Sequence, residues 1–363
     1  MSDRPEHIHE GALRIIAAWP EVMSETEWLL EREKGIGGSD AGTIAGVNRY
    51  NSALQLWSEK THTIEREFHG NEATEWGHLL EDDIATKYAR DYNKAIVEWP
   101  VLIWSLHPER GFMYANLDYV EVEPSEEFPA GEVVTWKKVV PPPNIIDIVE
   151  CKTTGIATNG AAHHWENGGV PESYQVQGYH YGTVIDCLLP ESHVTFVALV
   201  GGKGLQVRGM GRRPTDNLLW DDSIAENILI AEEQFWDLVT YMVEPEIDGS
   251  DATSSLIEAR YPRSSEGKIY EGTAEFRELL EAFEAQKAAV KKATEEQQKL
   301  RSQIVAHLGD AEAAMVDGVL VATFKSGKER ESFDAARFEK ENPEMYKSYI
   351  KKSPGARTLL PKV

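Results

Sequence analysis

The sequence contains few cysteines and no long apolar run. Only Cys151 and Cys187 occur among its 363 residues, and neither has a neighbour at the spacing of metal ligands. So few thiols favour a reducing compartment, for which we expect the cytoplasm, and they exclude a four-cysteine iron–sulfur cluster. No run of about 18 apolar residues exists, which predicts no membrane span. The polar first residues, "MSDRPEHIHEG", show no apolar centre of a secretory signal.

Basic residues are also scarce. The chain has 37 Lys and Arg against 61 Asp and Glu, a formal net charge of −24 at pH 7. Taken alone, this balance argues against a nucleic-acid-binding protein, but the local distribution of charge matters more. Residues 201–213 hold four basic residues and no acidic one, and residues 325–363 hold ten basic against six acidic. Whether these segments are binding surfaces or a solvated loop and tail stays open.

Two common site patterns are absent as well. The glycine-rich "GIGG" at residues 35–38 does not match G-x-x-x-x-G-K-[ST], so no phosphate-binding P-loop is expected. His163 and His164 are adjacent, and neighbouring residues on a helix do not face together. We therefore interpret these histidines as surface or near-substrate residues, not as a metal-binding pair.

Hydrophobic residues make up 41% of the chain, enough for a core, and their spacing predicts helices on both sides of a block of strands. Ser24 and Glu27 have the spacing of a capping box, which predicts a helix from Ser24. Ser39 or Asp40 is expected to cap a second, short helix. Further helices are expected at residues 52–61, 72–93, 172–188, 217–243 and 273–308, with a small one in the tail.

Apolar and β-branched runs predict the strands, and Asp317-Gly318 predicts a hairpin turn. This order predicts an α/β fold with a mixed central β-sheet flanked by helices and a helical C-terminal extension. We expect a core at residues 1–245 and an extension at 246–363 with a long helix, a short hairpin and a basic tail. The strands expected are 95–104, 111–122, 132–140, 145–152, 193–202, 205–211 and a hairpin over 313–326, with a surface linker at 244–255.

The strand "NIIDIVECK" ends in two charged residues, which is unusual for a buried strand. Because strand side chains alternate between faces, Glu150 and Lys152 share one face and Cys151 points the other way. Burying a carboxylate and an ammonium is costly unless both have partners. An isolated E-x-K of this kind is most simply a structural ion pair.

Asp118 adds a second carboxylate, at the end of the apolar run in "ANLDYV". A hairpin over residues 112–151 would bring it beside Glu150. Mg²⁺ prefers a few carboxylates, a carbonyl and several waters, and a neighbouring lysine can orient or deprotonate an attacking water. This arrangement predicts metal-assisted hydrolysis of a phosphodiester, although the spacing alone is common by chance.

Five motifs in order resemble the YqaJ-type viral recombinase family, which belongs with the lambda-type exonucleases in the PD-(D/E)xK nuclease superfamily. The resemblance covers about residues 24–200 and the last forty or so residues. The motifs are "IGGSDAGTIAGVNRYNSALQLWSEKT", "EWGHLLEDDIATKY", "ANLDYV…IVECKTTG", "SYQVQGYHYG" and the tail from "FKSGKERESF" to "TLLPK". One departure is the gap of 31 residues between Asp118 and Glu150, which implies an extended hairpin.

The resemblance implies a PD-(D/E)xK nuclease core with a metal site. Asp118 and Glu150 match the metal-binding carboxylates, and Lys152 matches the catalytic lysine. The backbone carbonyl of Cys151 would be a further ligand. Glu81 matches a helix glutamate facing the metals, although it also reads as an ordinary surface residue.

The resemblance also implies contacts with DNA. Gln175, accompanied by Tyr174 and Gln177, matches a glutamine near the scissile phosphate, or it serves packing alone. Arg32 and Ser39 match a pocket for a 5′-terminal phosphate, and Arg49 matches a basic residue along the DNA path. The open alternatives are a helix cap for Ser39 and solvated charges for both arginines.

The implied activity is a Mg²⁺-dependent exonuclease, with Mn²⁺ as an alternative ion, which degrades linear duplex DNA from 5′ to 3′ and leaves 3′ overhangs. The implied partners are a single-strand annealing protein and further copies in a ring, in a bacterial cytoplasm and of phage or prophage origin. Two alternatives stay open: another nuclease of the superfamily, either RecB-type or an endonuclease, and a non-catalytic DNA-binding protein with this fold.

Overall fold

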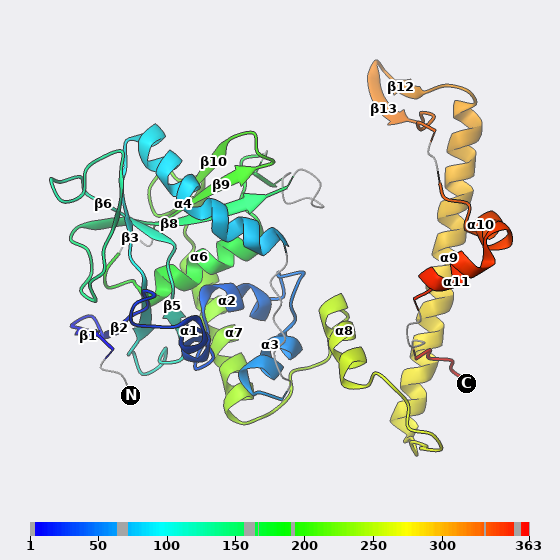
Figure 1. Ribbon diagram of the computed structural model, residues 1–363, viewed down its shortest axis with the longest axis horizontal. Helices are drawn as coiled ribbons and strands as arrows, with labels where there is room; N and C mark the ends of the chain where they lie inside the picture. The colour runs from blue at the N-terminus through cyan, green and yellow to red at the C-terminus, as the bar shows by residue number, and fades with distance from the viewer. Residues whose placement is uncertain are drawn as a thin grey trace. The chain divides into compact units, whose positions relative to one another are not determined.

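The computed structural model describes residues 4–63, 72–155, 164–165, 167–189, 193–329, 332–351 and 357–362 (Figure 1). The chain forms two compact units, Met1–Glu258 and Ala259–Val363. No helix in these described ranges is both long and apolar enough to cross a membrane.

A seven-stranded mixed sheet forms the centre of the first unit, in the order β11-β10-β9-β8-β6-β3-β7. Strand β8 lies in the middle, parallel to β9 on one side and antiparallel to β6 on the other. The expected α/β fold with a mixed central sheet is confirmed. The strands are β3 (Ala95–Glu98), β6 (Tyr119–Val122), β7 (Val133–Thr135), β8 (Ile145–Thr154), β9 (Val194–Val200), β10 (Leu205–Gly211) and β11 (Leu218–Leu219).

Helices α4 (Glu72–Tyr92) and α6 (Glu172–Val184) cover opposite faces of this sheet (Figure 1). Consecutive strand residues point to opposite faces. Ile148 of β8 belongs to the same buried cluster as Tyr181 of α6, whereas Val149 belongs to the cluster of Ile84 on α4. Because both faces of β8 are covered, the neighbours Ile148 and Val149 are both apolar and both fully buried, as expected for a central strand.

A smaller antiparallel sheet, which the sequence did not predict in full, lies beside the first. Its order is β1-β2-β4-β5. The expected strand at 95–104 is divided by Trp99 and Pro100, so that β3 joins the large sheet and β4 the small one. The strands are β1 (Glu6–His9), β2 (Leu13–Ala17), β4 (Val101–Ser105) and β5 (Tyr114–Ala115).

Of the remaining helices of the first unit, the first begins where the sequence predicts. The Ser24 hydroxyl oxygen accepts a hydrogen bond from the backbone N–H of Glu27, and the Glu27 carboxylate accepts one from the backbone N–H of Ser24. These two bonds confirm the capping box. The expected cap of the second helix is wrong, because the N-cap is Gly37 and Ser39 lies inside the first turn. The helices are α1 (Glu25–Arg32), α2 (Gly38–Ile44), α3 (Ala53–Lys60), α7 (Asp222–Thr240) and α8 (Asp251–Arg260).

Three strand and linker predictions are wrong in detail. The expected strand 111–122 is two strands, β5 and β6, separated by residues 116–118. Strand β7 pairs in parallel with β3 at the sheet edge, so residues 132–140 do not form the return strand of the expected extended hairpin. Residues 244–255 are not all linker, because α8 begins at Asp251 and buries Leu256.

The second unit contains the long helix predicted from the sequence and the hairpin. Its turn residues Asp317 and Gly318 both have positive φ, at 51° and 80°, as the predicted Asp-Gly turn requires. The tail has two short helices instead of one. The elements are α9 (Ala274–Leu308), β12 (Ala313–Val316), β13 (Val319–Thr323), α10 (Ala335–Glu341) and α11 (Pro343–Tyr349).

Candidate active site

Strand pairing brings Asp118 and Glu150 together. Tyr119 of β6 pairs with Val149 of β8, so the residue before Tyr119 lies beside the residue after Val149. Asp118 therefore stands just before β6, not at the end of a strand as expected. Its Oδ2 accepts a hydrogen bond from the backbone N–H of Cys151 at 2.9 Å, which fixes the carboxylate against β8.

Lys152 lies between the two carboxylates. Its Nζ is 2.7 Å from Glu150 Oε2 and 3.5 Å from Asp118 Oδ2. Burial acts to lower the pKa of Lys152, but the two carboxylates raise it well above its ordinary value. Lys152 is therefore an ammonium group, which can donate hydrogen bonds but cannot take a proton from water.

Glu81 completes a group of acidic residues under mutual repulsion. Glu150 is fully buried, and burial together with the charge of Asp118 raises its pKa to about 7. Glu81, half-buried on α4, has a pKa raised to about 8 by burial and again by Asp118. One ammonium group lies among three carboxyl groups whose ionised forms repel one another, so an added cation would favour their ionised forms.

A divalent cation fits this donor set chemically. Glu150 Oε1 is buried and has no hydrogen-bond partner among the described residues, so it has a free acceptor position. Carboxylate oxygens are ligands that Mg²⁺ prefers. As the side chains stand, no three His, Cys, Asp or Glu within the described ranges are grouped as ligands of one ion. Binding would thus require Lys152 or the carboxylates to shift.

The two glutamines of "YQVQ" take different places on α6. Gln175 donates from Nε2 to the carbonyl of Val170 at 2.7 Å, in the segment before the helix. Gln177 donates from Nε2 to Glu150 Oε2 at 3.1 Å. The ring of Tyr174 lies 5.5 Å from Lys152 Nζ. In this arrangement Gln177, not Gln175, contacts the carboxylates.

Arg32 and Ser39 lie together in a second polar group of side chains, which we call the second pocket. Arg32 Nη2 donates to Ser39 Oγ at 3.3 Å and its Nε donates to the hydroxyl of Tyr114 at 3.0 Å. The guanidinium stands 4.2 Å over the ring of Trp28. Arg49 is exposed in the turn after α2.

A buried ion pair leaves the charge of Arg32 available. The carboxylate of Asp40 could neutralise the guanidinium of Arg32, but it is already paired with another cation. Asp40 Oδ2 is 2.8 Å from Nζ of Lys60. Lys60 also donates to the carbonyls of Arg32 and Gly35, at 3.0 and 2.6 Å. Because Lys60 compensates Asp40, the pocket keeps a net positive charge suited to an anion.

One short segment, residues 114–118, contributes to both pockets. Tyr114 accepts from Arg32, and Asn116 Oδ1 accepts from the indole N–H of Trp28 at 2.9 Å. Two residues further, Asp118 enters the carboxylate group. The two pockets are therefore held by the same stretch of backbone.

Tyr181 of α6 joins the segment to Glu150. Its hydroxyl donates to the backbone carbonyl of Asn116 at 2.9 Å and accepts from Gln177 Nε2 at 3.1 Å. The same amide reaches Glu150. Gly38 permits this approach, because a Cβ there would lie 2.5 Å from the ring of Tyr181.

Sequence reasoning missed Tyr181, Tyr114 and Lys60. Tyr181 is four residues after Gln177, so both lie on one face of α6. This spacing is the one signal in the sequence from which Tyr181 could have been found. Tyr114 and Lys60 carry no such signal, because their partners are distant in the chain.

The basic run at residues 201–213 does not form a free basic patch. Arg208 donates to the carbonyl of Trp165, Arg212 pairs with Asp222, and Arg213 donates to the carbonyl of Ile146. His164 is exposed, and His163 lies outside the described residues.

Comparisons with known proteins point to one family. The YqaJ-like viral recombinase domain matches residues 27–187. An uncharacterized protein named YqaJ from Bacillus subtilis (strain 168) is 31% identical over 296 residues, which is 81% of each chain. The matched region contains both pockets.

Among solved structures, a match is the crystal structure of LHK-Exo in complex with dAMP. The TM-score is 0.42 and the sequence identity 15%, over 60% of this chain and 94% of that one.

Proposed function

This chain belongs to the YqaJ-like viral recombinase family, and from that premise we propose that it is a nuclease acting on DNA in phage-type recombination. The observation that carries the proposal is the meeting of Asp118 and Glu150 around Lys152, with Glu81 under the electrostatic influence of Asp118. The linked Arg32–Ser39 pocket supports a substrate with a terminal phosphate.

In its finer form, the proposal is a Mg²⁺-dependent exonuclease that degrades linear duplex DNA from 5′ to 3′ and leaves 3′ overhangs. Asp118, Glu150, Glu81 and the carbonyl of Cys151 would hold Mg²⁺, or Mn²⁺ in its place. When bound, the ion would stabilise the charge that develops on the attacking and leaving oxygens.

The chain's own side chains have separate tasks in this proposal. Lys152, kept as an ammonium by its neighbours, donates to a phosphate oxygen or holds the attacking water. Gln177 positions Glu150 through its amide. Gln175 is assigned to the neighbourhood of the scissile phosphate, which requires it to leave the carbonyl of Val170.

The second pocket would set the end at which the enzyme begins. Arg32 presents its guanidinium, and Ser39 a hydroxyl, to a 5′-terminal phosphate. Arg49 would line the path of the duplex. Residues 114–118 contact both the Arg32 group and the carboxylates. A phosphate held by Arg32 would therefore lie at a fixed distance from the carboxylates.

We further assign a single-strand annealing protein as partner, a ring of copies around the DNA, and the cytoplasm of a bacterial host of a phage or prophage. These assignments rest on the family resemblance. Without a membrane-spanning helix in the described ranges, no membrane contact is part of the proposal.

A linear duplex labelled at either end, with and without 5′ phosphate, tests the proposal. We expect release of label from the 5′ end in Mg²⁺, faster with 5′ phosphate, and none with a chelator. Asp118→Asn should lower the rate by more than about 100-fold while duplex binding persists. The exposed Asp83→Asn on α4 is the matched control and should keep the rate.

Other outcomes separate the alternatives. Cleavage of circular duplex would identify an endonuclease, and binding without cleavage by the unmodified chain would identify a non-catalytic protein. Equal rates with and without 5′ phosphate would remove the assignment of Arg32 and Ser39 but leave the metal site.

A further inference from the structure

Helix α9 has an apolar stripe that is left open. The helix is 35 residues long and none of its side chains is buried. Phe283, Val290 and Leu300 are 45%, 65% and 60% exposed. Apolar residues with three- and four-residue spacing are typical of a helix that packs against another helix. The α9 stripe consists of Phe276, Leu279, Phe283, Val290, Ala293, Leu300 and Ile304.

The charge on α9 is divided between its halves. Residues 274–289 hold four Glu and two basic residues, and residues 290–308 hold four basic residues and two Glu. The first half therefore carries a charge of −2 and the second half +2. Two copies of α9 side by side in antiparallel orientation would place opposite charges together, whereas a parallel pair would place like charges together.

The antiparallel orientation also matches the stripe residue by residue. With the two-fold axis between Lys291 and Lys292, Phe283 faces Leu300 of the second copy, and Leu279 faces Ile304. The two polar positions within the stripe, Gln286 and Gln297, then face each other. Their amides can hydrogen-bond together, so neither is buried against an apolar side chain.

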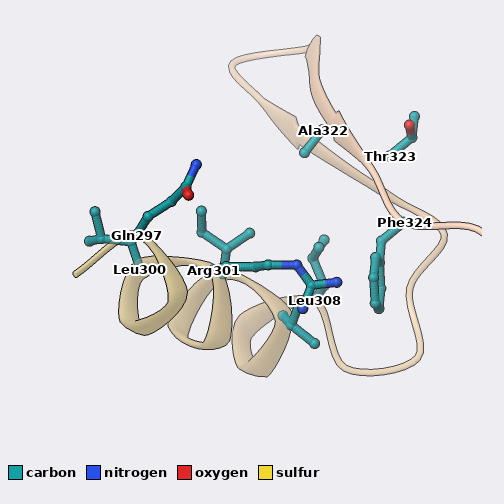
Figure 2. A pocket seen from close by; sticks show the side chains of 9 residues that line it. Gln297, Leu300, Arg301, Leu308, Ala322, Thr323 and Phe324 are labelled. Atoms are coloured by element: carbon teal, nitrogen blue, oxygen red, sulfur yellow. The ribbon is translucent and has the colours of Figure 1, made fainter. Parts of the chain in front are cut away.

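A pocket lies beside the last residues of the α9 stripe. Its volume is about 280 Å³. It is bordered by Leu300 and Leu308 of the helix, by Ala322 of β13 and by Phe324, which directly follows that strand (Figure 2). Ile304 also lines it. The register brings Leu279 of the second copy against Ile304, one of the residues that line this pocket.

We propose that α9 is a self-association element, which pairs antiparallel with α9 of a second copy of this chain. The contact uses the second unit alone. It does not depend on the proposed nuclease function, and it would link copies whether or not they also form a ring through other surfaces.

Disulfide trapping in the full chain tests the pairing and its direction. The background is Cys187→Ser, because Cys187 is exposed and Cys151 is buried. Phe283→Cys and Leu300→Cys proteins are prepared separately, mixed and oxidised. We expect the mixed disulfide to exceed the Glu295→Cys control by about tenfold, because pairing raises the effective concentration of the thiols. Glu295 is on the opposite face of the helix.

Each other outcome overturns the proposal. Disulfides between two Phe283→Cys chains would mean parallel pairing, since antiparallel copies hold these positions 17 residues, or about 25 Å, apart. A yield no higher than the Glu295→Cys control would mean that α9 does not pair. Sedimentation of Leu279→Lys should show the loss of this association, while digestion of linear duplex continues, which separates this proposal from the nuclease assignment.

Discussion

At the scale of single residues, Lys152 compensates charge that would otherwise be buried alone. Its ammonium lies 2.7 Å from the fully buried Glu150 and 3.5 Å from Asp118. Breaking a buried pair by removing one partner costs more than a surface pair does, because the other charge stays desolvated. Lys152 therefore matters for folding as well as for any reaction.

We predict that Lys152→Met lowers the free energy of unfolding by about 3–5 kcal/mol in a chelator, and that Mg²⁺ restores more stability to the variant than to the original chain. A divalent ion can take the position of the lost ammonium between the carboxylates. Urea unfolding with and without Mg²⁺ measures this. Lys137→Met, which removes the exposed pair with Glu21, is the control and should change little. An equal response to Mg²⁺ in both proteins would contradict the metal assignment.

Tyr181 gives a second prediction at this scale. Its hydroxyl connects the Asn116 carbonyl to the Gln177 amide that holds Glu150. Without the hydroxyl, the amide loses one acceptor and Glu150 loses its orientation. Tyr181→Phe should therefore lower the turnover rate by about tenfold, which corresponds to about 1.4 kcal/mol, with unchanged affinity for duplex.

Tyr179→Phe is the matched control for Tyr181. The Tyr179 hydroxyl accepts from the backbone of Asp221, away from the carboxylates. A purely structural role for Tyr181 would lower the thermal stability of both variants alike and leave the turnover rate unchanged. Separate measurement of the turnover rate, the Michaelis constant and the melting temperature distinguishes the two roles.

The sequence pointed to the charged residues of the candidate site but not to the polar groups that contact them. Asp118, Glu150 and Lys152 stand out because charge at a buried strand end has few explanations. Tyr181 and Tyr114 are aromatic residues in apolar surroundings, where nearly every pattern favours a core role. Only the packing of α6 against β5 shows that their hydroxyls have polar partners.

At the scale of elements, a buried ion pair fastens α6 to α7. His180 and Glu232 are both fully buried, with Nδ1 2.8 Å from the Glu232 carboxylate. The other ring nitrogen, Nε2, is 2.9 Å from the backbone carbonyl of Tyr114 on β5. A carbonyl only accepts, so Nε2 carries a proton, and a carboxylate at Nδ1 favours a second one. The charged imidazolium satisfies both contacts.

This pair should make folding stability depend on pH. Burial acts to lower the pKa of His180, but the Glu232 carboxylate raises it above its ordinary value. Stability from such a group is complete below the unfolded pKa of about 6.5 and is lost as pH rises through the higher folded pKa. Glu232→Gln should cost about 3 kcal/mol at pH 6, and its difference from the original chain should shrink towards pH 9.

Urea unfolding at pH 6, 7, 8 and 9 measures that difference. Glu226→Gln, an exposed substitution on the same helix, should reproduce the pH profile of the original chain. A constant difference between Glu232→Gln and the original chain over the whole range would mean that His180 is neutral when folded.

Element predictions from the sequence were reliable where the signal is local. The capping box at Ser24, the spacing in α4 and the Asp-Gly turn at residues 317–318 depend on neighbours within four residues, and all three are confirmed. Strand pairing depends on distant segments. That is why β7 was expected in an extended hairpin, although it pairs in parallel with β3 at the edge.

At the scale of the whole molecule, charge is unevenly divided. Residues 1–258 hold 18 basic and 44 acidic residues, and residues 259–363 hold 19 and 17. The net charges are −26 and +2, so the acidity belongs to the unit with the candidate site. A whole-chain average therefore did not predict the positive pocket at Arg32, because Asp40 beside it is compensated by Lys60.

The division of the chain itself gives the last prediction. The sequence places the domain boundary at residue 245, whereas the compact units divide at Glu258, because α8 buries Leu256 in the cluster of Leu54 and Phe235. Residues 261–273 are all exposed and lie outside any helix or strand. A broad-specificity protease at low dose should cut there first among the bonds between residues 240 and 275, since cleavage requires exposed, unpaired backbone. Mass spectrometry should find an N-terminal fragment that retains α8. Fragments that end near residue 245 would instead show that α8 is not part of the core.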